Sequence, residues 1–316
     1  MIKRAISKEL RKLLKEYPVV VILGPRQSGK TTLARSFKKY AYCNLESPEN
    51  RFLAEQDPKT FLKQNKAPVI LDEIQRTPFL LSYIQLIVDQ NNLNGQFILT
   101  GSQNLYLMSA VSQSLAGRVG ILNLLPFSIK ELEQADIQYE NFTDYGHTGF
   151  LPRVYDKNQR AWAAYSNYYR TYVERDVRQL INLKNQNLFG KFMKLLAGRV
   201  GQIMNTSSLA NDVGVSSRTV DHWLSILETS FIIYKLPPYF KNFGKRLIKS
   251  PKYYFMEIGL LCFLLGLQKP SHIARDPLVG GIFENLIVIE ALKSLYNKGK
   301  DSSLYFFRDS NGREID

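Results

Sequence analysis

The segment from Gly24 to Thr32 has the residue types and spacing of a phosphate-binding loop. It reads Gly-Pro-Arg-Gln-Ser-Gly-Lys-Thr-Thr and follows the apolar run Val19 to Leu23, which predicts a buried strand. The two glycines allow the backbone N–H groups to face a phosphate. Lys30 would reach the β- and γ-phosphates, and the Thr31 hydroxyl would be a Mg²⁺ ligand. We therefore expect ATP and Mg²⁺ to bind at Gly24, Pro25, Arg26, Gln27, Ser28, Gly29, Lys30, Thr31 and Thr32.

Two carboxylates, Asp72 and Glu73, end a second apolar run, Val69 to Leu71. Asp72 would hold Mg²⁺ through water, and Glu73, on the other face of the strand, could act as general base toward the attacking water. The interval between the loop and this pair leaves room for one more strand, predicted over residues 40–45. That spacing is typical of P-loop ATPases that carry a catalytic glutamate.

A third buried run, Phe97 to Leu99, ends in Thr-Gly-Ser-Gln at residues 100–103. Ser102 or Gln103 could hold the lytic water in an AAA-type site; the alternative is a turn with a capping serine. Phosphoryl transfer also needs a cation for its transition state. Arg118 is the first candidate for this arginine finger, with Arg175 and Arg199 in reserve, and a plain surface charge is the alternative for each.

Buried strands alternating with helices predict an α/β fold, a P-loop ATPase core with a parallel sheet and helices on both faces, over residues 1–127. A tyrosine-rich helical lid or linker is expected over residues 128–196. The last residues read as a long helix, a strand and an Asn-Gly turn. Because a chain rarely stops inside a hairpin, this ending predicts that the natural protein continues.

A winged helix-turn-helix is predicted over residues 197–252, from apolar and small residues around Leu209 and Gly214. Its second helix, capped by Ser217, would expose Arg218 and His222. The segment from Tyr239 to Tyr254 lacks acidic residues, and its bases could contact DNA phosphates. The alternative is a docking module for a protein partner. The basic candidates in this segment are Lys241, Lys245, Arg246 and Lys249.

The overall charge is consistent with a polyanionic partner. The 316 residues carry a formal net charge of +14, although a basic surface kept for solubility gives the same number. No apolar run approaches 18 residues, and the N-terminus lacks a secretory signal pattern, so we expect no membrane span. Two cysteines and three scattered histidines predict neither a disulfide framework nor a zinc site, which fits the cytoplasm.

Together these segments resemble the uncharacterised prokaryotic AAA-type ATPases that carry a C-terminal domain of unknown function. The resemblance rests on residues 24–33, 70–76, 99–102, 114–118, 125–128 and 249–255. It implies an ATPase core, a winged helix and the start of a restriction-endonuclease-like domain over residues 253–316. Glu284 and Asp316 would then align with the first acidic positions of a nuclease site. In two departures, Glu257 replaces the usual Asp, and no Glu-x-Lys follows Asp316.

Three functional hypotheses follow from the sequence. The first is Mg²⁺-dependent ATP hydrolysis coupled to DNA binding or remodelling. The second is a nucleotide-dependent switch that docks a protein partner through the winged helix. The third is an ATP-dependent nuclease whose site needs residues beyond 316. Homo-oligomerisation stays open, and with it the question of whether an arginine finger acts within one chain or from a neighbour.

Overall fold

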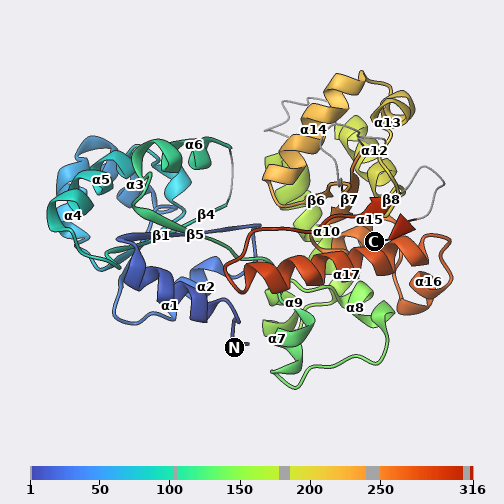
Figure 1. The fold of residues 1–316 in the computed structure, drawn as a ribbon, viewed down its shortest axis with the longest axis horizontal. Helices are drawn as coiled ribbons and strands as arrows, with labels where there is room; N and C mark the ends of the chain where they lie inside the picture. The colour runs from blue at the N-terminus through green and yellow to red at the C-terminus, as the bar shows by residue number, and fades with distance from the viewer. Residues whose placement is uncertain (1, 103–104, 178–185, 240–249, 309–313, 316) are drawn as a thin grey trace. The chain divides into compact units, whose positions relative to one another are not determined.

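The computed structural model describes residues 2–102, 105–177, 186–239, 250–308 and 314–315 (Figure 1). The chain divides into two compact units. The N-terminal unit contains residues 3–126 and 296–300. The C-terminal unit contains residues 127–295 and 301–316, with residues 1–2. Each unit is described by itself.

A five-stranded parallel sheet forms the centre of the N-terminal unit. Its order is β2-β3-β4-β1-β5, so the strand before the phosphate loop lies between β4 and β5. Every residue of β1 is buried, as the continuous apolar run predicts. The α/β expectation is thus confirmed. The strands are β1 (Val19–Gly24), β2 (Ala41–Asn44), β3 (Val69–Asp72), β4 (Phe97–Ser102) and β5 (Val119–Asn123).

Helices flank this sheet (Figure 1). Leu10 and Leu14 of α1 pack in one cluster with Val20 and Ile22 of β1. Their spacing of four residues places both leucines on the same helical face. The helical elements are α1 (Ser7–Glu16), α2 (Lys30–Arg35), α3 (Pro48–Gln56), α4 (Pro58–Gln64), the 3-10 turn η1 (Ile74–Arg76), α5 (Leu80–Asn91) and α6 (Leu105–Ser114).

The C-terminal unit is mainly helical, with two small antiparallel strand pairs. Its helices are α7 (Ile129–Glu133), α8 (Phe142–Thr148), α9 (Pro152–Asp156), α10 (Ala161–Tyr168), the π-helix η2 (Tyr169–Val177), α12 (Gln186–Ala197), α13 (Thr206–Val213), α14 (Ser217–Thr229), α15 (Ile258–Leu264), α16 (Pro270–Ala274) and α17 (Val279–Tyr296). Its strands are β6 (Ile233–Leu236), β7 (Lys252–Phe255), β8 (Phe307–Arg308) and β9 (Glu314–Ile315).

Helices α13 and α14 occupy the segment predicted as a helix-turn-helix. Gly214 ends α13 with φ of 94°, a left-handed conformation that glycine adopts without strain. Ser216 caps α14 by accepting a hydrogen bond from the Thr219 N–H at 3.2 Å, so the predicted cap at Ser217 was wrong by one residue. Strands β6 and β7 then pair antiparallel, with Leu236 opposite Lys252.

Candidate functional site

The phosphate loop follows the carboxyl end of β1, and glycines shape its two ends. A Cβ atom on Gly24 would lie 2.1 Å from the Leu124 carbonyl oxygen, so any side chain there would collide with the backbone that follows β5. Gly29 precedes α2 with φ of 92°, again in the left-handed region. The sequence pattern predicts that both glycines allow close approach of a phosphate. The protein backbone alone already requires one at position 24.

Lys30 is buried at the start of α2, and its ammonium points back into the loop. The Nζ donates hydrogen bonds to the carbonyl oxygens of Gly24, at 3.0 Å, and Pro25, at 2.8 Å. Burial lowers the pKa of Lys30 to about 8. The Ser28 hydroxyl is also buried and has no hydrogen-bond partner among the described residues. A buried cation and an unpaired hydroxyl in one loop fit a phosphate group.

Asp72 accepts hydrogen bonds from three hydroxyl groups at the end of β3. The Thr31 hydroxyl lies 3.0 Å from both carboxylate oxygens, and the Tyr42 hydroxyl lies 2.8 Å from Oδ2. Thr100 donates to Oδ1 from the neighbouring strand β4. Hydroxyl and carboxylate oxygens are the ligands that Mg²⁺ prefers. The adjacent Thr31 and Asp72 therefore fit the predicted metal site.

Glu73 follows β3 directly, but the alternation of side chains along a strand does not set the direction of its side chain. Its φ is 62°, a left-handed conformation that is uncommon outside glycine, and its N–H donates to the Thr100 hydroxyl at 3.2 Å. Its carboxylate accepts a hydrogen bond from the Gln75 side-chain amide and lies 3.5 Å from the Ser102 hydroxyl. The structure thus brings Glu73 and Ser102 together. Gln103, the other candidate for the lytic water, lies outside the described residues.

Four residues in this site were not predicted as contributors: Tyr42, Gln75, Thr100 and Arg4. The Arg4 guanidinium donates to the carbonyl oxygens of Ser28, at 2.7 Å, and Leu125, at 2.6 Å, and so ties the phosphate loop to the chain after β5. Thr100 belongs to the Thr-Gly-Ser-Gln segment at residues 100–103, and its position at the end of a strand is a usable signal. Nothing local in the sequence marks Tyr42 or Arg4, because each meets its partner through pairing of distant segments.

Arg118 lies at the amino end of the parallel strands, whereas the phosphate loop lies at their carboxyl end. Its carbonyl accepts the Val19 N–H at 3.2 Å, level with the start of β1, whereas the loop follows the end of that strand at Gly24. At a rise of about 3.3 Å per residue, this separation is about 17 Å. The guanidinium forms an ion pair with Asp89 of α5 at 2.5 Å. Within one chain, Arg118 therefore cannot reach the phosphates.

The two reserve arginines belong to the C-terminal unit. The Arg199 guanidinium forms an ion pair with Asp212 and donates to the Leu195 carbonyl at 2.8 Å, so it has structural partners within the C-terminal unit. The side chain of Arg175 lies outside the described residues.

The candidate DNA contacts are only partly covered by the structure. Arg218 and His222 are both exposed and lie one helical turn apart on α14, as predicted. Lys241, Lys245, Arg246 and Lys249 lie outside the described residues. They belong to the segment that connects the antiparallel strands β6 and β7, which is where a wing would lie.

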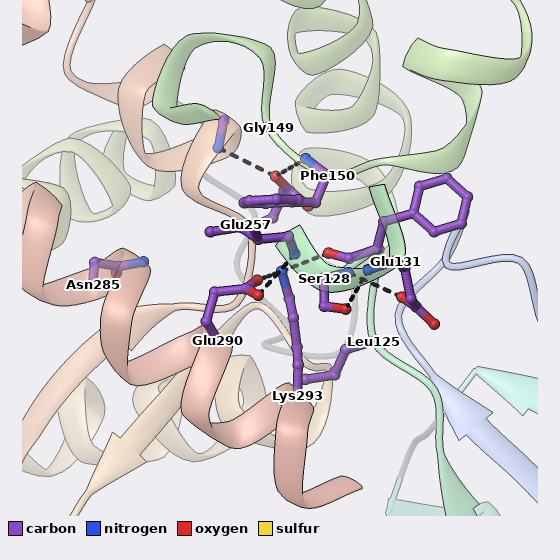
Figure 2. Close-up of polar contacts among 12 residues, drawn as sticks. Leu125, Ser128, Glu131, Gly149, Phe150, Glu257, Asn285, Glu290 and Lys293 are labelled. Carbon is purple, nitrogen blue, oxygen red and sulfur yellow. Dashed lines mark hydrogen bonds and ion pairs between the residues drawn. The ribbon is translucent and has the colours of Figure 1, made fainter. Parts of the chain in front are cut away.

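A buried polar network includes Phe127 and Ser128, which belong to another motif that carries the family resemblance, residues 125–128 (Figure 2). Ser128 and Glu131 form a reciprocal capping box at the start of α7. Lys293 of α17 is buried and donates to the Phe127 carbonyl and to Glu290, both at 2.8 Å. These contacts join α17 to the chain before α7. These hydrogen bonds give Ser128 a structural role, whereas Phe127 contributes only its backbone carbonyl.

Glu257 and Glu284 also have structural partners. The Glu257 carboxylate accepts hydrogen bonds from the Phe150 N–H at 2.8 Å and the Tyr165 hydroxyl at 2.9 Å, and burial raises its pKa. Glu284 accepts from the buried Lys252 ammonium at 2.9 Å and from the Tyr254 hydroxyl. The family resemblance aligns Glu284 with an acidic position of a nuclease site, whereas in this structure its carboxylate forms an ion pair with Lys252. Asp316 lies outside the described residues.

The described residues hold neither a metal-ligand cluster nor a membrane-spanning helix. They contain no group of three His, Cys, Asp or Glu side chains arranged to hold a metal ion. Over the same part of the chain, every helix is too short or too polar to cross a membrane.

Comparisons with known proteins cover both units. Residues 16–133 match an AAA domain, and residues 139–271 and 279–316 match two domains of unknown function. The uncharacterized protein Rv2008c of Mycobacterium tuberculosis and its Mycobacterium bovis counterpart are each 31% identical over 322 residues, covering 99% of this chain and 70% of theirs. An uncharacterized Haemophilus influenzae protein is 26% identical and matches 88% of this chain and 75% of its own.

One solved structure supports the fold. The Walker-type ATPase PABY2304 of Pyrococcus abyssi superimposes with a TM-score of 0.54 at 14% identity, covering 84% of this chain and 96% of the other. At this identity the similarity concerns the fold alone. It agrees with the parallel sheet and phosphate loop described above.

Proposed function

The chain belongs to the same family as these mycobacterial proteins and contains an AAA domain, and we propose that it binds ATP with Mg²⁺, hydrolyses it and couples hydrolysis to DNA. The observation that carries the proposal is the grouping of the candidate side chains at the carboxyl ends of the parallel strands. Lys30 and Thr31 lie in the loop, Asp72 is hydrogen-bonded to Thr31, and Glu73 lies beside Ser102. In P-loop ATPases these residue types bind the phosphates, the metal and the attacking water.

Each residue has a distinct part in the proposed reaction. Lys30 would bind the β- and γ-phosphates, and Thr31 and Asp72 would hold Mg²⁺, which neutralises phosphate charge when bound. Glu73 would accept the proton of the attacking water, whose oxygen forms a bond to the γ-phosphorus. The bond from that phosphorus to the β,γ-bridging oxygen then breaks, and ADP and phosphate leave. Ser102 would help to hold the water.

The DNA part of the proposal rests on the helices α13 and α14 and on charge. The exposed face of α14 carries Arg218 and His222, and β6 and β7 flank a segment rich in lysine and arginine. The whole chain carries a net charge of +14. A helix with an exposed polar face beside a basic wing is a common arrangement for contacting DNA phosphates.

Salt dependence tests this DNA role. Replacing Lys245 and Arg246 together by alanine should weaken duplex binding for all sequences alike and flatten the log–log salt slope by about two, since each phosphate contact contributes about −0.9. The slope comes from fluorescence anisotropy at several salt concentrations, with Lys191 and Lys194 of α12 changed to alanine as a control of equal charge. An unchanged slope in the wing variant, with loss of self-association or of a protein partner, would favour the docking role instead.

DNA-stimulated turnover tests the coupling. The proposal predicts faster ATP hydrolysis when duplex DNA is added, and a smaller increase for the Lys245 and Arg246 double variant. A rate that DNA does not alter would favour the nucleotide-dependent switch.

A further inference from the structure

Gln75 links the two polar segments that end strands β3 and β4. It lies in the turn η1, and its side-chain Nε2 donates to Glu73 Oε2 and, at 3.5 Å, to the Ser102 hydroxyl. The Ser102 hydroxyl is in turn 3.5 Å from the same Glu73 oxygen. The three side chains therefore form a closed triangle. Both contacts to Glu73 end on Oε2, and in the described part of the chain no hydrogen bond reaches Oε1.

The fold makes space for Gln75 at a specific glycine. A Cβ atom on Gly101 would lie 2.8 Å from the Gln75 Oε1 and 2.7 Å from the Leu107 Cδ2. The Gln75 Oε1 is buried and has no hydrogen-bond partner among the described residues. An unpaired buried carbonyl is unfavourable, so packing alone gives no reason for an amide at this position. Because Gly101 has no side chain, the Gln75 amide can lie here with its N–H donor directed at Glu73.

Glu73 is restrained at its backbone as well. Its left-handed conformation is stabilised by the hydrogen bond from its N–H to Thr100, whose hydroxyl also reaches Asp72. With the backbone held by Thr100 and one carboxylate oxygen held by Gln75, little rotational freedom remains for the other oxygen. A general base is most effective when its accepting oxygen is held in one position relative to its substrate.

We propose that Gln75 is a positioning residue for ATP hydrolysis, which holds Glu73 Oε2 so that Oε1 faces the attacking water. This inference rests on the proposed ATPase function. Gln75 touches neither the phosphate loop nor Asp72 in the described hydrogen bonds, so its effect should be confined to the water side of the site. It acts through Glu73.

The test separates turnover from binding. Gln75→Met keeps the length of the side chain and removes its N–H donors; kcat should fall about tenfold or more, since general-base catalysis contributes about 10²–10⁴-fold. The KM and the Kd of a fluorescent ATP analogue should stay within about twofold of the parent. Gly101→Ala displaces the same amide without changing a polar group, and its kcat should fall as well. Gly280→Ala, where an added Cβ meets nothing within 4 Å, is the matched control.

The double variant that combines Gln75→Met with Glu73→Gln tests whether Gln75 acts through Glu73. If Gln75 acts through Glu73, Gln75→Met should lower the residual rate of Glu73→Gln no further. A parental kcat in Gln75→Met, a raised kcat, or a Kd that weakens in step with kcat would each overturn the inference. If the parent protein shows no ATP turnover, or turnover that Lys30→Ala does not reduce, the proposed function fails, and the role of Gln75 fails with it. Circular dichroism of each variant confirms folding.

Discussion

The carboxylate of Asp72 is the point at which three separate segments of the N-terminal unit meet. Thr31 comes from the phosphate loop, Tyr42 from the edge strand β2 and Thr100 from β4. Three hydroxyl donors fix the orientation of one carboxylate. Thr31 is itself a proposed Mg²⁺ ligand, whereas Tyr42 and Thr100 would strengthen metal binding through Asp72 without touching the metal.

Tyr42→Phe should therefore weaken the response to Mg²⁺. Loss of an outer hydrogen bond to a metal ligand typically costs about tenfold or more in metal affinity, so the Mg²⁺ concentration for half-maximal ATP hydrolysis should rise by about that factor. Tyr40→Phe is a matched control, because its hydroxyl donates to the Gly95 carbonyl at 2.8 Å, away from Asp72. A Mg²⁺ titration that is identical for parent and Tyr42→Phe would show that Thr31 and Thr100 suffice.

At this scale, the sequence predicted the residues that motifs define and missed those that tertiary pairing supplies. Lys30, Thr31, Asp72 and Glu73 follow from spacing and from the adjoining apolar strands. Tyr42 reaches Asp72 because β2 pairs in parallel with β3, a register that is not visible locally. The contact between Gln75 and Ser102 likewise depends on β3 lying beside β4.

Among the secondary-structure elements, the helix N-termini show which capping residues a local sequence pattern can predict. Ser128 and Glu131 form a capping box that the spacing Ser-x-x-Glu marks in the sequence. At the start of α14 two consecutive serines, Ser216 and Ser217, offer similar capping chemistry, and the helix is capped by the first. Composition identifies such a helix start, but the backbone conformation selects the capping residue.

Glu257, the residue that caps α15, should make the free energy of unfolding depend on pH. Burial raises its pKa above the unfolded value, so the folded state holds a proton that the unfolded state releases. Stability therefore falls as pH rises through the unfolded pKa of about 4.3 toward the raised folded value, and this loss persists above it. Glu257→Gln should lack that loss, so its stability relative to the parent should increase with pH over this window.

Urea denaturation at a series of pH values checks the prediction. Trp162 and Trp223, both in the C-terminal unit, report its unfolding by fluorescence. A constant difference in unfolding free energy between Glu257→Gln and the parent, from pH 4 to pH 8, would contradict the raised pKa.

At the scale of the whole molecule, Arg118 bears on whether a single copy of the chain is sufficient for ATP hydrolysis. It lies about 17 Å along β1 from its own phosphate loop, so a finger role would require a second copy. Under that role, Arg118→Ala should reduce turnover roughly a hundredfold or more. Mixing it with Lys30→Ala should then restore activity, because each variant supplies what the other lacks. Asp89→Asn, which keeps the arginine, is the control.

A parental rate in Arg118→Ala would show that the ion pair with Asp89 is only a surface contact. Failure of the mixture to regain turnover would contradict action between copies.

The central claim, that this chain hydrolyses ATP with Glu73 as the base, is tested most directly by single-turnover hydrolysis and ATP binding in three proteins. The parent should bind and hydrolyse ATP with Mg²⁺. Lys30→Ala should bind ATP weakly, since it lacks the charge that faces the phosphates, whereas Glu73→Gln should bind ATP as the parent does and lose turnover about a hundredfold or more. Hydrolysis by Glu73→Gln at the parental rate would contradict the account.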